Sequence, residues 1–235
     1  KKRDQQLYLA ARVHPVEAAN LDIGMDVRTW LAEKLVNLVI PSSGGAESSF
    51  VDSNPIAQWL IESAHAAGAW VYMPTSKVPY DDRHHVQTVE MIRAAATTHH
   101  AIGADGLYMA DLSWPHTERE YQILREMGDP DIYARKKKHY TLGPKAPEKT
   151  PHQLQRYLPV TLEQGRAVRM PLFIGDALDR ALADGELERV TLGFRVVQTC
   201  PEDRLRFRFN GQDLSVAEAQ VRTYYGGIVS YGASR

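Results

Sequence analysis

Four short apolar runs, separated by helical segments, recur along the first half of the sequence, and this repeat restricts the chain to a few folds. The runs are Gln6–Val13, Val36–Ser43, Ala69–Ser76 and Asp105–Leu112. Each is nearly continuous in apolar residues, which is typical of parallel strands buried on both faces. Their spacing of about 30–35 residues matches βαβ units. The repeat predicts an α/β domain with a parallel sheet, either half of a (β/α)8 barrel or a small doubly wound sheet.

Helix boundary signals lie between these runs. Asp26 predicts the N-cap of the amphipathic segment that follows it. Asn54 and Pro55 predict the cap and first position of a second helix, which ends at Gly68. A third helical segment ends at Gly103. These signals support the alternation of strands and helices.

The pattern changes after Trp114. The segment "TEREYQILREMG" predicts one more amphipathic helix, and a basic, proline-rich connector follows it. We expect the half barrel to span residues 1–145, a linker to span 146–157, and an antiparallel β-sandwich-like domain to span 158–235.

Three segments of the expected β domain alternate with period two, namely "AVRMPLFIG", "LERVTLGFRVV" and "RLRFRFNGQDL". Asn210 and Gly211 form the Asn-Gly pair that favours a tight hairpin. The segment "DALDRALADGELE" predicts a short helix that runs into a turn at Asp184 and Gly185. The β domain is therefore expected to contain one short helix.

Composition excludes several classes of protein. The net charge of −1, from 28 basic and 29 acidic residues, argues against a nucleic-acid or membrane-surface binder. The single Cys200 forms neither an internal disulfide nor a cysteine-rich metal site. No apolar run approaches the ~20 residues of a membrane span. The chain begins without Met and ends in a strand-like segment, so we interpret it as a piece of a longer protein. The sequence does not indicate the cellular compartment of that protein.

Polar and aromatic residues gather where the four expected strands end. In α/β barrels the loops at these carboxyl ends converge on the active site. The candidates comprise a catalytic Asp111 and the substrate-binding residues Arg12, His14, Ser42, Thr75, Lys77 and Trp114. One carboxylate, several hydroxyls, two cations and an aromatic plate are the groups that recognise sugars, whose hydroxyls need polar partners and whose C–H faces stack on rings. We therefore expect a carbohydrate ligand.

Each candidate also has a structural interpretation. Arg12 is equally suited to a structural ion pair, and Asp111 to capping the helix that starts near Thr117. In the structural interpretation, Trp114 packs against its own loop. The loop that begins at Ser42 is interpreted as solvated, because no helix N-terminus follows it directly to bind a phosphate. Asp105 lies at the start of its strand, which is the stability end of a barrel.

Two further clusters carry no expected function. The pairs His84–His85 and His99–His100 lack Cys, Asp or Glu at metal-ligand spacing, so we expect no metal site. The run Arg135–Lys138 is interpreted as a solvated patch, because no aromatic residues alternate with it. No cofactor is expected.

Several segments resemble barrel proteins described as family 10 glycosylhydrolase-like. The resemblance runs, in one order, through "LAARV", "IGMDVRTWLAEKLVNLVIPS", "VEMIRAAATTHHAIGADGLYMAD", "LREMGDPDIYARKKKHY", "LPVTL" and "RFRFNGQDL". It implies that "LAARV" is about the fifth barrel strand, so that the four strands form the second half of a barrel. It also implies that an acidic residue at the tip of the fourth strand lies upstream of Lys1 and that the β domain continues past Arg235.

These observations lead to a glycoside-hydrolase-like protein that acts on or binds carbohydrate at the carboxyl ends of its strands. Glycoside hydrolysis needs two carboxylates about 5–9.5 Å apart, and only Asp111 is available at a strand end. We therefore expect the chain alone to be inactive and to self-associate through its open barrel edges. The alternative is a polysaccharide-binding module without catalysis. A sugar-phosphate or amino-acid enzyme of the barrel class ranks below both. Such an enzyme requires a glycine-rich phosphate-binding turn after the last two strands, and the segments "MPTSKVPYDD" and "MADLSWPHTE" lack one.

Overall fold

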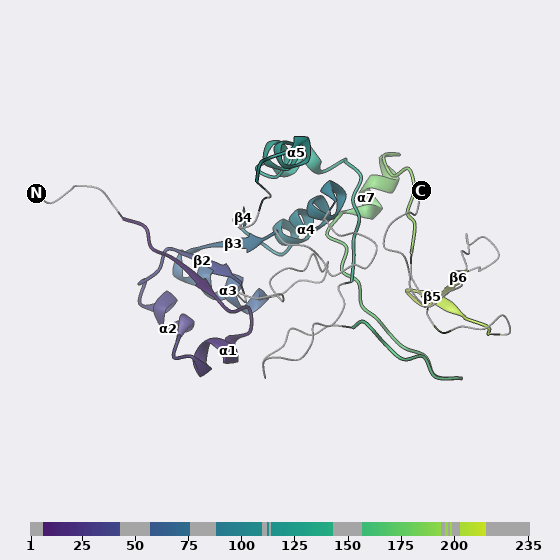
Figure 1. Ribbon diagram of the computed structural model, residues 1–235, viewed down its shortest axis with the longest axis horizontal. Coiled ribbons are helices and arrows are strands. Elements are labelled where there is room, and N and C mark those ends of the chain that lie inside the picture. The colour runs from purple at the N-terminus through teal and green to yellow at the C-terminus, as the bar shows by residue number, and fades with distance from the viewer. Residues whose placement is uncertain are drawn as a thin grey trace, which may run out of the picture. The chain divides into compact units, whose positions relative to one another are not determined.

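The structure, a computed structural model (Figure 1), describes residues 7–42, 57–75, 88–109, 112, 114–142, 157–193, 196, 198 and 203–214. The chain divides into two compact units, residues 1–178 and 179–235. The first contains a mixed α/β fold, and the second contains a small antiparallel hairpin. The linker expected at 146–157 lies outside the described residues except for Tyr157.

Four parallel strands form the sheet of the first unit. They are β1 (Ala10–Val13), β2 (Leu38–Pro41), β3 (Trp70–Pro74) and β4 (Gly106–Tyr108). Their order in the sheet is β1-β2-β3-β4, and all three pairings are parallel. The parallel sheet predicted from the four apolar runs is thus confirmed, and its strand order shows no reversal.

Helices connect consecutive strands. They are α1 (Glu17–Asp22) and α2 (Val27–Ala32) after β1, α3 (Gln58–Ala67) after β2, and α4 (Val89–Ala101) after β3. The N-cap predicted at Asp26 is confirmed, because its Oδ1 accepts a hydrogen bond from the Thr29 N–H at 3.1 Å. The end of α3 at Gly68 is also confirmed, with φ of 74°. Asn54 and Pro55 lie outside the described residues, where α3 was expected to begin.

The hydrophobic core lies between these helices and one face of the sheet. Val39 of β2 and Val71 of β3 are fully buried in a cluster with Leu31 of α2 and Leu60 of α3. Helix α4 packs in a second cluster with Leu107 of β4. Leu107 is the register partner of Met73, which belongs to the first cluster. Since register partners in parallel strands point to the same face, α2, α3 and α4 all pack on one side of the sheet.

The other side of the sheet carries a different set of side chains, which we call the aromatic face: Arg12, Trp70, Tyr72 and Tyr108. Their positions follow from the register, which pairs Arg12 with Ile40 and Tyr72 with Gly106. The Tyr72 ring lies so close over Gly106 that an added Cβ would come within 2.8 Å of its Cε1 atom. The glycine therefore makes room for an aromatic ring on this face.

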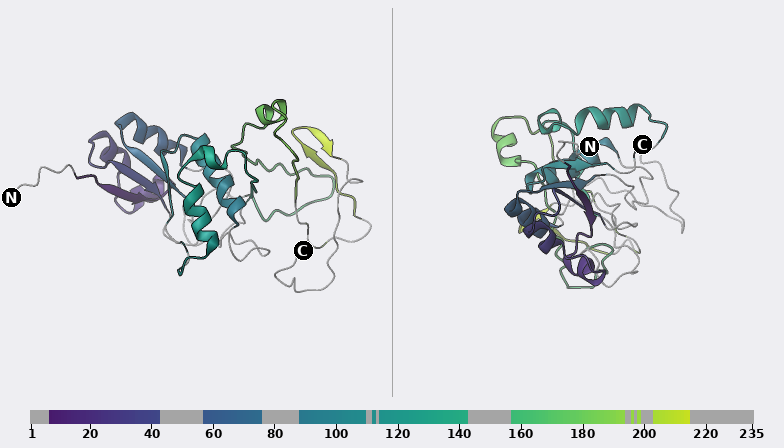
Figure 2. Two further views of the ribbon diagram at one scale, coloured as in Figure 1. Left: turned by 90° about the horizontal axis from the view of Figure 1, so that it is seen from above. Right: turned by 90° about the vertical axis from the view of Figure 1, so that its left-hand side faces the viewer.

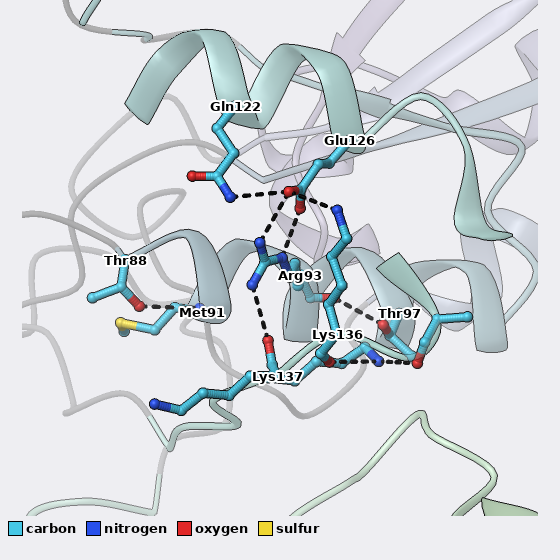
Figure 3. Close-up of polar contacts among 10 residues, drawn as sticks. Thr88, Met91, Arg93, Thr97, Gln122, Glu126, Lys136 and Lys137 are labelled. Carbon is cyan, nitrogen blue, oxygen red and sulfur yellow. Dashed lines mark hydrogen bonds and ion pairs between the residues drawn. The ribbon is translucent and has the colours of Figure 1, made fainter. Parts of the chain in front are cut away.

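Two more helices, α5 (Glu118–Glu126) and α6 (Pro130–Tyr133), pack against α4 (Figure 2). The amphipathic helix predicted after Trp114 is confirmed by α5. A buried polar cluster joins α5 to α4 (Figure 3): Arg93 of α4 donates to Glu126 of α5, which also accepts from Gln122 and Lys136. The Arg93 guanidinium further donates to the Lys137 carbonyl oxygen. This cluster holds the chain that follows α6 against α4.

The basic run Arg135–Lys138 differs from the solvated patch we expected. The Lys138 side chain is only 4% exposed, and its Nζ lies 2.9 Å from Asp176 Oδ1. The Tyr140 hydroxyl donates to the other carboxylate oxygen of Asp176 at 2.8 Å. Two of the lysines thus form ion pairs, because tertiary packing brings Glu126 and Asp176 to them.

Residues 159–193 contain one helix, α7 (Leu178–Ala183), and no strand. This confirms the short helix expected before the turn at Asp184 and Gly185, where Gly185 has φ of 70°. The described residues of the alternating segments on either side of it form no strand. Alternation creates an apolar face, but a strand also requires a neighbour for its N–H and C=O groups.

Antiparallel pairing is confirmed for one hairpin, β5 (Phe207–Phe209) and β6 (Gln212–Leu214). The turn residues Asn210 and Gly211 have φ of 48° and 86°. Positive φ at both central positions is the geometry of a type I′ turn, as predicted from the Asn-Gly pair.

Candidate functional site

Arg12 is the centre of the candidate site on the aromatic face. It lies near the carboxyl end of β1 and donates from Nη2 to the hydroxyl of Ser42, which follows β2, at 2.9 Å. Its Cζ lies 5.8 Å from the ring centroid of Tyr108 in β4. The structure therefore brings together the predicted residues Arg12 and Ser42, and it adds Tyr108.

The contact between Arg12 and Tyr108 crosses the whole width of the sheet. These residues belong to β1 and β4, the two outermost of the four strands. Neighbouring strands lie about 4.8 Å apart, and side chains stand roughly perpendicular to a sheet. The long Arg12 side chain therefore reaches across the aromatic face to the opposite edge of the sheet.

His14 is held by the loop that leads into α1. Its Nδ1 accepts a hydrogen bond from the Val16 N–H at 3.0 Å, so in the neutral ring the proton is on Nε2. The buried Asn20 side chain accepts from the His14 N–H at 2.7 Å and donates to the His14 carbonyl oxygen at 2.8 Å. Asn20 thus fixes the backbone at a predicted site residue. Sequence reasoning missed it, although an amide inside an apolar helix pattern is a recognisable signal.

Thr75 follows β3 and is buried, with an exposed fraction of 3%. Its N–H donates to the Tyr108 carbonyl oxygen at 3.1 Å, which ties the ends of β3 and β4 together. Its hydroxyl is one of two buried side-chain atoms without a hydrogen-bond partner in the described structure, the other being Nδ1 of His99. Contact between Thr75 and substrate stays a prediction.

His99 of α4 packs at the end of β3. Its Nε2 lies 3.2 Å from the Pro74 carbonyl oxygen. Burial lowers the pKa of His99 from 6.5 to about 4, because the charged ring would lose its hydration. The neighbouring His100 contacts the Tyr133 hydroxyl instead. Within the described ranges, no group of three or more His, Cys, Asp or Glu side chains is placed to hold a metal ion.

Trp114 begins an aromatic row beyond the end of β4. Its side chain is 83% exposed. Its ring meets His116 edge-on at a centroid distance of 5.2 Å, and His116 meets Tyr121 of α5 in the same way at 5.7 Å. The exposed fraction argues against the alternative in which Trp114 merely packs its loop. An exposed indole supported by two further rings presents a flat apolar surface.

The two remaining candidates, Asp111 and Lys77, lie outside the described residues. One alternative for Asp111 was that it caps the helix after it. That helix has its own capping box, in which Thr117 is the N-cap and Glu120 accepts from the Thr117 N–H at 2.8 Å. Hydrogen bonds from Thr117 lower the pKa of Glu120 to about 2.

Asp105, expected at the stability end of the sheet, has structural contacts. Its Oδ2 accepts from the Val71 N–H at 2.7 Å and lies 3.0 Å from His65 Nε2. These bonds join β3, α3 and the start of β4 at the end opposite to the candidate site. The position supports the structural interpretation of Asp105.

Two aromatic residues of the site, Tyr72 and Tyr108, were missed from the sequence. Both lie inside apolar runs, where they were counted as buried strand residues. The detectable signal is their alternation with Val71, Met73 and Leu107, which places the tyrosines on the opposite face of the sheet.

Comparisons with known proteins do not identify a relative: no protein-family model matches the chain, and no curated protein matches it. None of the helices in the described part of the chain combines the length and hydropathy that a bilayer span requires.

Proposed function

We propose that this chain is the second half of a (β/α)8 barrel of the glycoside-hydrolase type, and that its aromatic face binds carbohydrate at the carboxyl ends of the strands. The strand order supports a barrel half. Right-handed crossovers along an order without reversal leave every helix on one side of the sheet, whereas a doubly wound sheet reverses its order and has helices on both. For residues 158–235 we propose a sandwich-like β domain built around the hairpin β5–β6.

The observation that carries the proposal is the contact of Arg12 with Ser42 and Tyr108. Arg12 of β1, Tyr108 of β4 and Ser42, which follows β2, lie together and provide N–H donors, a ring and a hydroxyl. Sugar recognition uses such groups, because planar donors bind ring hydroxyls and aromatic faces stack on C–H surfaces. Trp114 would extend this surface for a longer glycan.

Catalysis would depend on Asp111 as the acid or base. Two-carboxylate hydrolysis requires a second carboxylate at about 5–9.5 Å, and none of the described residues of the aromatic face is acidic. That composition favours the second candidate function, a polysaccharide-binding module without catalysis. Both candidates share the same face and the same ligand class.

Binding and turnover of glycans distinguish the two candidates. Pull-down on insoluble polysaccharides and calorimetry on soluble oligosaccharides measure binding, and release of reducing ends measures hydrolysis. We expect Trp114→Ala to weaken glycan binding about tenfold, since stacking on one ring supplies roughly 1 kcal/mol or more. Its melting temperature should stay close to that of the wild type, because the indole is exposed.

A matched pair of aspartate variants tests the assigned site. In the full-length protein, Asp111→Asn should weaken glycan binding or turnover and leave the melting temperature nearly unchanged. Asp105→Asn should lower the melting temperature and leave glycan affinity unchanged, because Asp105 bonds the opposite end of the sheet. Turnover lost with affinity retained in Asp111→Asn supports the hydrolase. Absence of binding to any glycan by the wild-type chain would overturn both candidates.

A further inference from the structure

Two exposed arginines of this chain have nearly the same neighbours. Arg28 of α2 donates to Ser63 Oγ at 2.9 Å, and its Cζ lies 5.1 Å from the centroid of the Trp59 ring. Arg12 donates to Ser42 Oγ at 2.9 Å, and its Cζ lies 5.8 Å from the centroid of the Tyr108 ring. Each guanidinium therefore lies against one hydroxyl and one aromatic ring.

The two arginines differ in their acidic partner. Glu17 accepts hydrogen bonds from both Nε and Nη2 of Arg28, the latter at 3.1 Å, in the two-bond geometry that a guanidinium and a carboxylate favour. In the described part of the chain, Arg12 forms no ion pair. Its hydrogen bond to Ser42 uses one of the five N–H donors of a guanidinium. Among the described residues, Arg28 thus has a hydroxyl, a ring and a carboxylate, and Arg12 has the hydroxyl and the ring without a carboxylate.

We infer that the aromatic face binds an acidic carbohydrate, and that a sugar carboxylate occupies on Arg12 the place that Glu17 occupies on Arg28. This inference rests on the proposed function and specifies its ligand class as a uronic-acid glycan. The carboxylate would accept two parallel hydrogen bonds from Arg12, while the sugar ring packs against Tyr108. With a net charge of −1, the protein as a whole does not attract polyanions. A preference for acidic glycans must therefore come from individual contacts at the site, such as those of Arg12.

Calorimetry with matched glycans tests this assignment on the full 235-residue chain. The probes are oligogalacturonate, oligomannuronate and oligoglucuronate, each paired with its carboxyl-reduced form, which has a neutral primary alcohol in place of the carboxylate. Measurements at about 0.15 M salt limit long-range attraction. The variants are Arg12→Gln, Arg12→Lys and the matched control Arg28→Gln.

We expect at least one acidic oligomer to bind about 10- to 100-fold more tightly than its reduced form, as charge-assisted hydrogen bonds allow. Arg12→Gln should abolish this preference. Arg12→Lys should keep only part of it, because an ammonium group lacks the planar fork. Arg28→Gln should retain it in full, since its partner is Glu17.

Three results would overturn the inference. Equal affinity for every acidic oligomer and its reduced form would exclude an acidic ligand but leave the proposed function standing. A preference that survives in Arg12→Gln would place the carboxylate elsewhere. A marked fall in melting temperature of Arg12→Gln, without any change in glycan preference, would show that Arg12 has a structural partner within the protein. Failure of the proposed function has a different signature, namely no binding to acidic or neutral glycans alike.

Discussion

Arg93 and Glu126 join α4 to α5 through two parallel hydrogen bonds, Nε to Oε2 at 2.7 Å and Nη2 to Oε1 at 3.0 Å (Figure 3). Their side chains are only 8% and 6% exposed. The Arg93 guanidinium holds the pKa of Glu126 at about 2, well below its ordinary value of 4.5. A charge pair this well matched and this deeply buried binds two elements firmly only as long as both partners are present.

Removing one partner of this pair should destabilise the first unit strongly. We expect Glu126→Leu to lower the free energy of unfolding by about 3–5 kcal/mol, because Arg93 is left as a buried charge without its carboxylate. Urea denaturation followed by tryptophan fluorescence measures this effect. All four tryptophans lie within the first unit, which makes the signal specific to it.

A double variant and a surface variant serve as controls for that prediction. Arg93→Met combined with Glu126→Leu should recover most of the lost stability, because no buried charge remains unpaired and Lys136 is partly exposed to solvent. Glu118→Leu removes an exposed partner of Arg125 and should cost less than about 1 kcal/mol. A double variant as unstable as Glu126→Leu would show that the polar cluster contributes more than charge neutrality.

His99 should make the first unit sensitive to mild acid. Its folded pKa of about 4 is below the ordinary value of 6.5, so protons bind the unfolded chain more tightly. The stabilising contribution is fully present above pH 6.5 and is lost as the pH falls towards 4, by about 3 kcal/mol in total. Urea midpoints measured across this range report the loss.

His99→Gln should remove that component of the pH dependence, since an amide does not titrate. His65→Gln serves as the matched control, because it leaves His99 in place and should therefore retain the decline. An unchanged pH profile in His99→Gln would mean that another group carries the dependence.

Gly175 should tolerate no side chain. A Cβ there would lie 2.9 Å from both the Cα and the N of Thr98, which are backbone atoms of α4 that cannot rotate away. We expect Gly175→Ala to cost about 1–3 kcal/mol, as overpacking does elsewhere. Gly128→Ala is the control, because nothing lies within 4 Å of its added Cβ. Thermal unfolding of the two variants should differ accordingly, and equal stability would place residue 175 away from α4.

The hairpin β5–β6 should depend on Gly211. Its φ of 86° is unfavourable for any residue with a Cβ, so Gly211→Ala should destabilise the turn by about 1 kcal/mol. Cross-strand nuclear Overhauser effects between Phe207 and Leu214, which are register partners, should weaken. Gly193→Ala should leave them intact, because Gly193 has neither close neighbours nor a positive φ. Unchanged cross-strand signals in Gly211→Ala would argue against the type I′ turn.

Self-association through the sheet edge is expected at high protein concentration. Leu7 and Leu9 lead into β1, an outermost strand, and both are exposed. Replacing both by Lys should lower the apparent mass in light scattering, because charged side chains oppose edge pairing. Leu35→Lys alters another exposed leucine, which lies between α2 and β2, and should have little effect. A monomeric wild-type chain at all concentrations would contradict this expectation.

Local signals in the sequence determined much of the first unit. Buried parallel strands need apolar residues at nearly every position, so β1 to β4 are visible as apolar runs. Caps and turns depend on single residues with a distinctive backbone or side chain. Asp26, Gly68 and the Asn210–Gly211 pair therefore act as predicted, because their effect extends over only a few neighbouring residues.

Tertiary structure decided which side chains meet. Arg12 and Tyr108 are separated by nearly a hundred residues, and only the assembled sheet brings them together. The same holds for Lys138, which looks solvated in a basic run but is buried beside Asp176. Alternation in residues 159–193 likewise indicates an apolar face without supplying a partner strand. A second segment of the chain is required for charge pairing, for side-chain convergence and for strand pairing. A local sequence pattern does not specify which distant segment will be that partner.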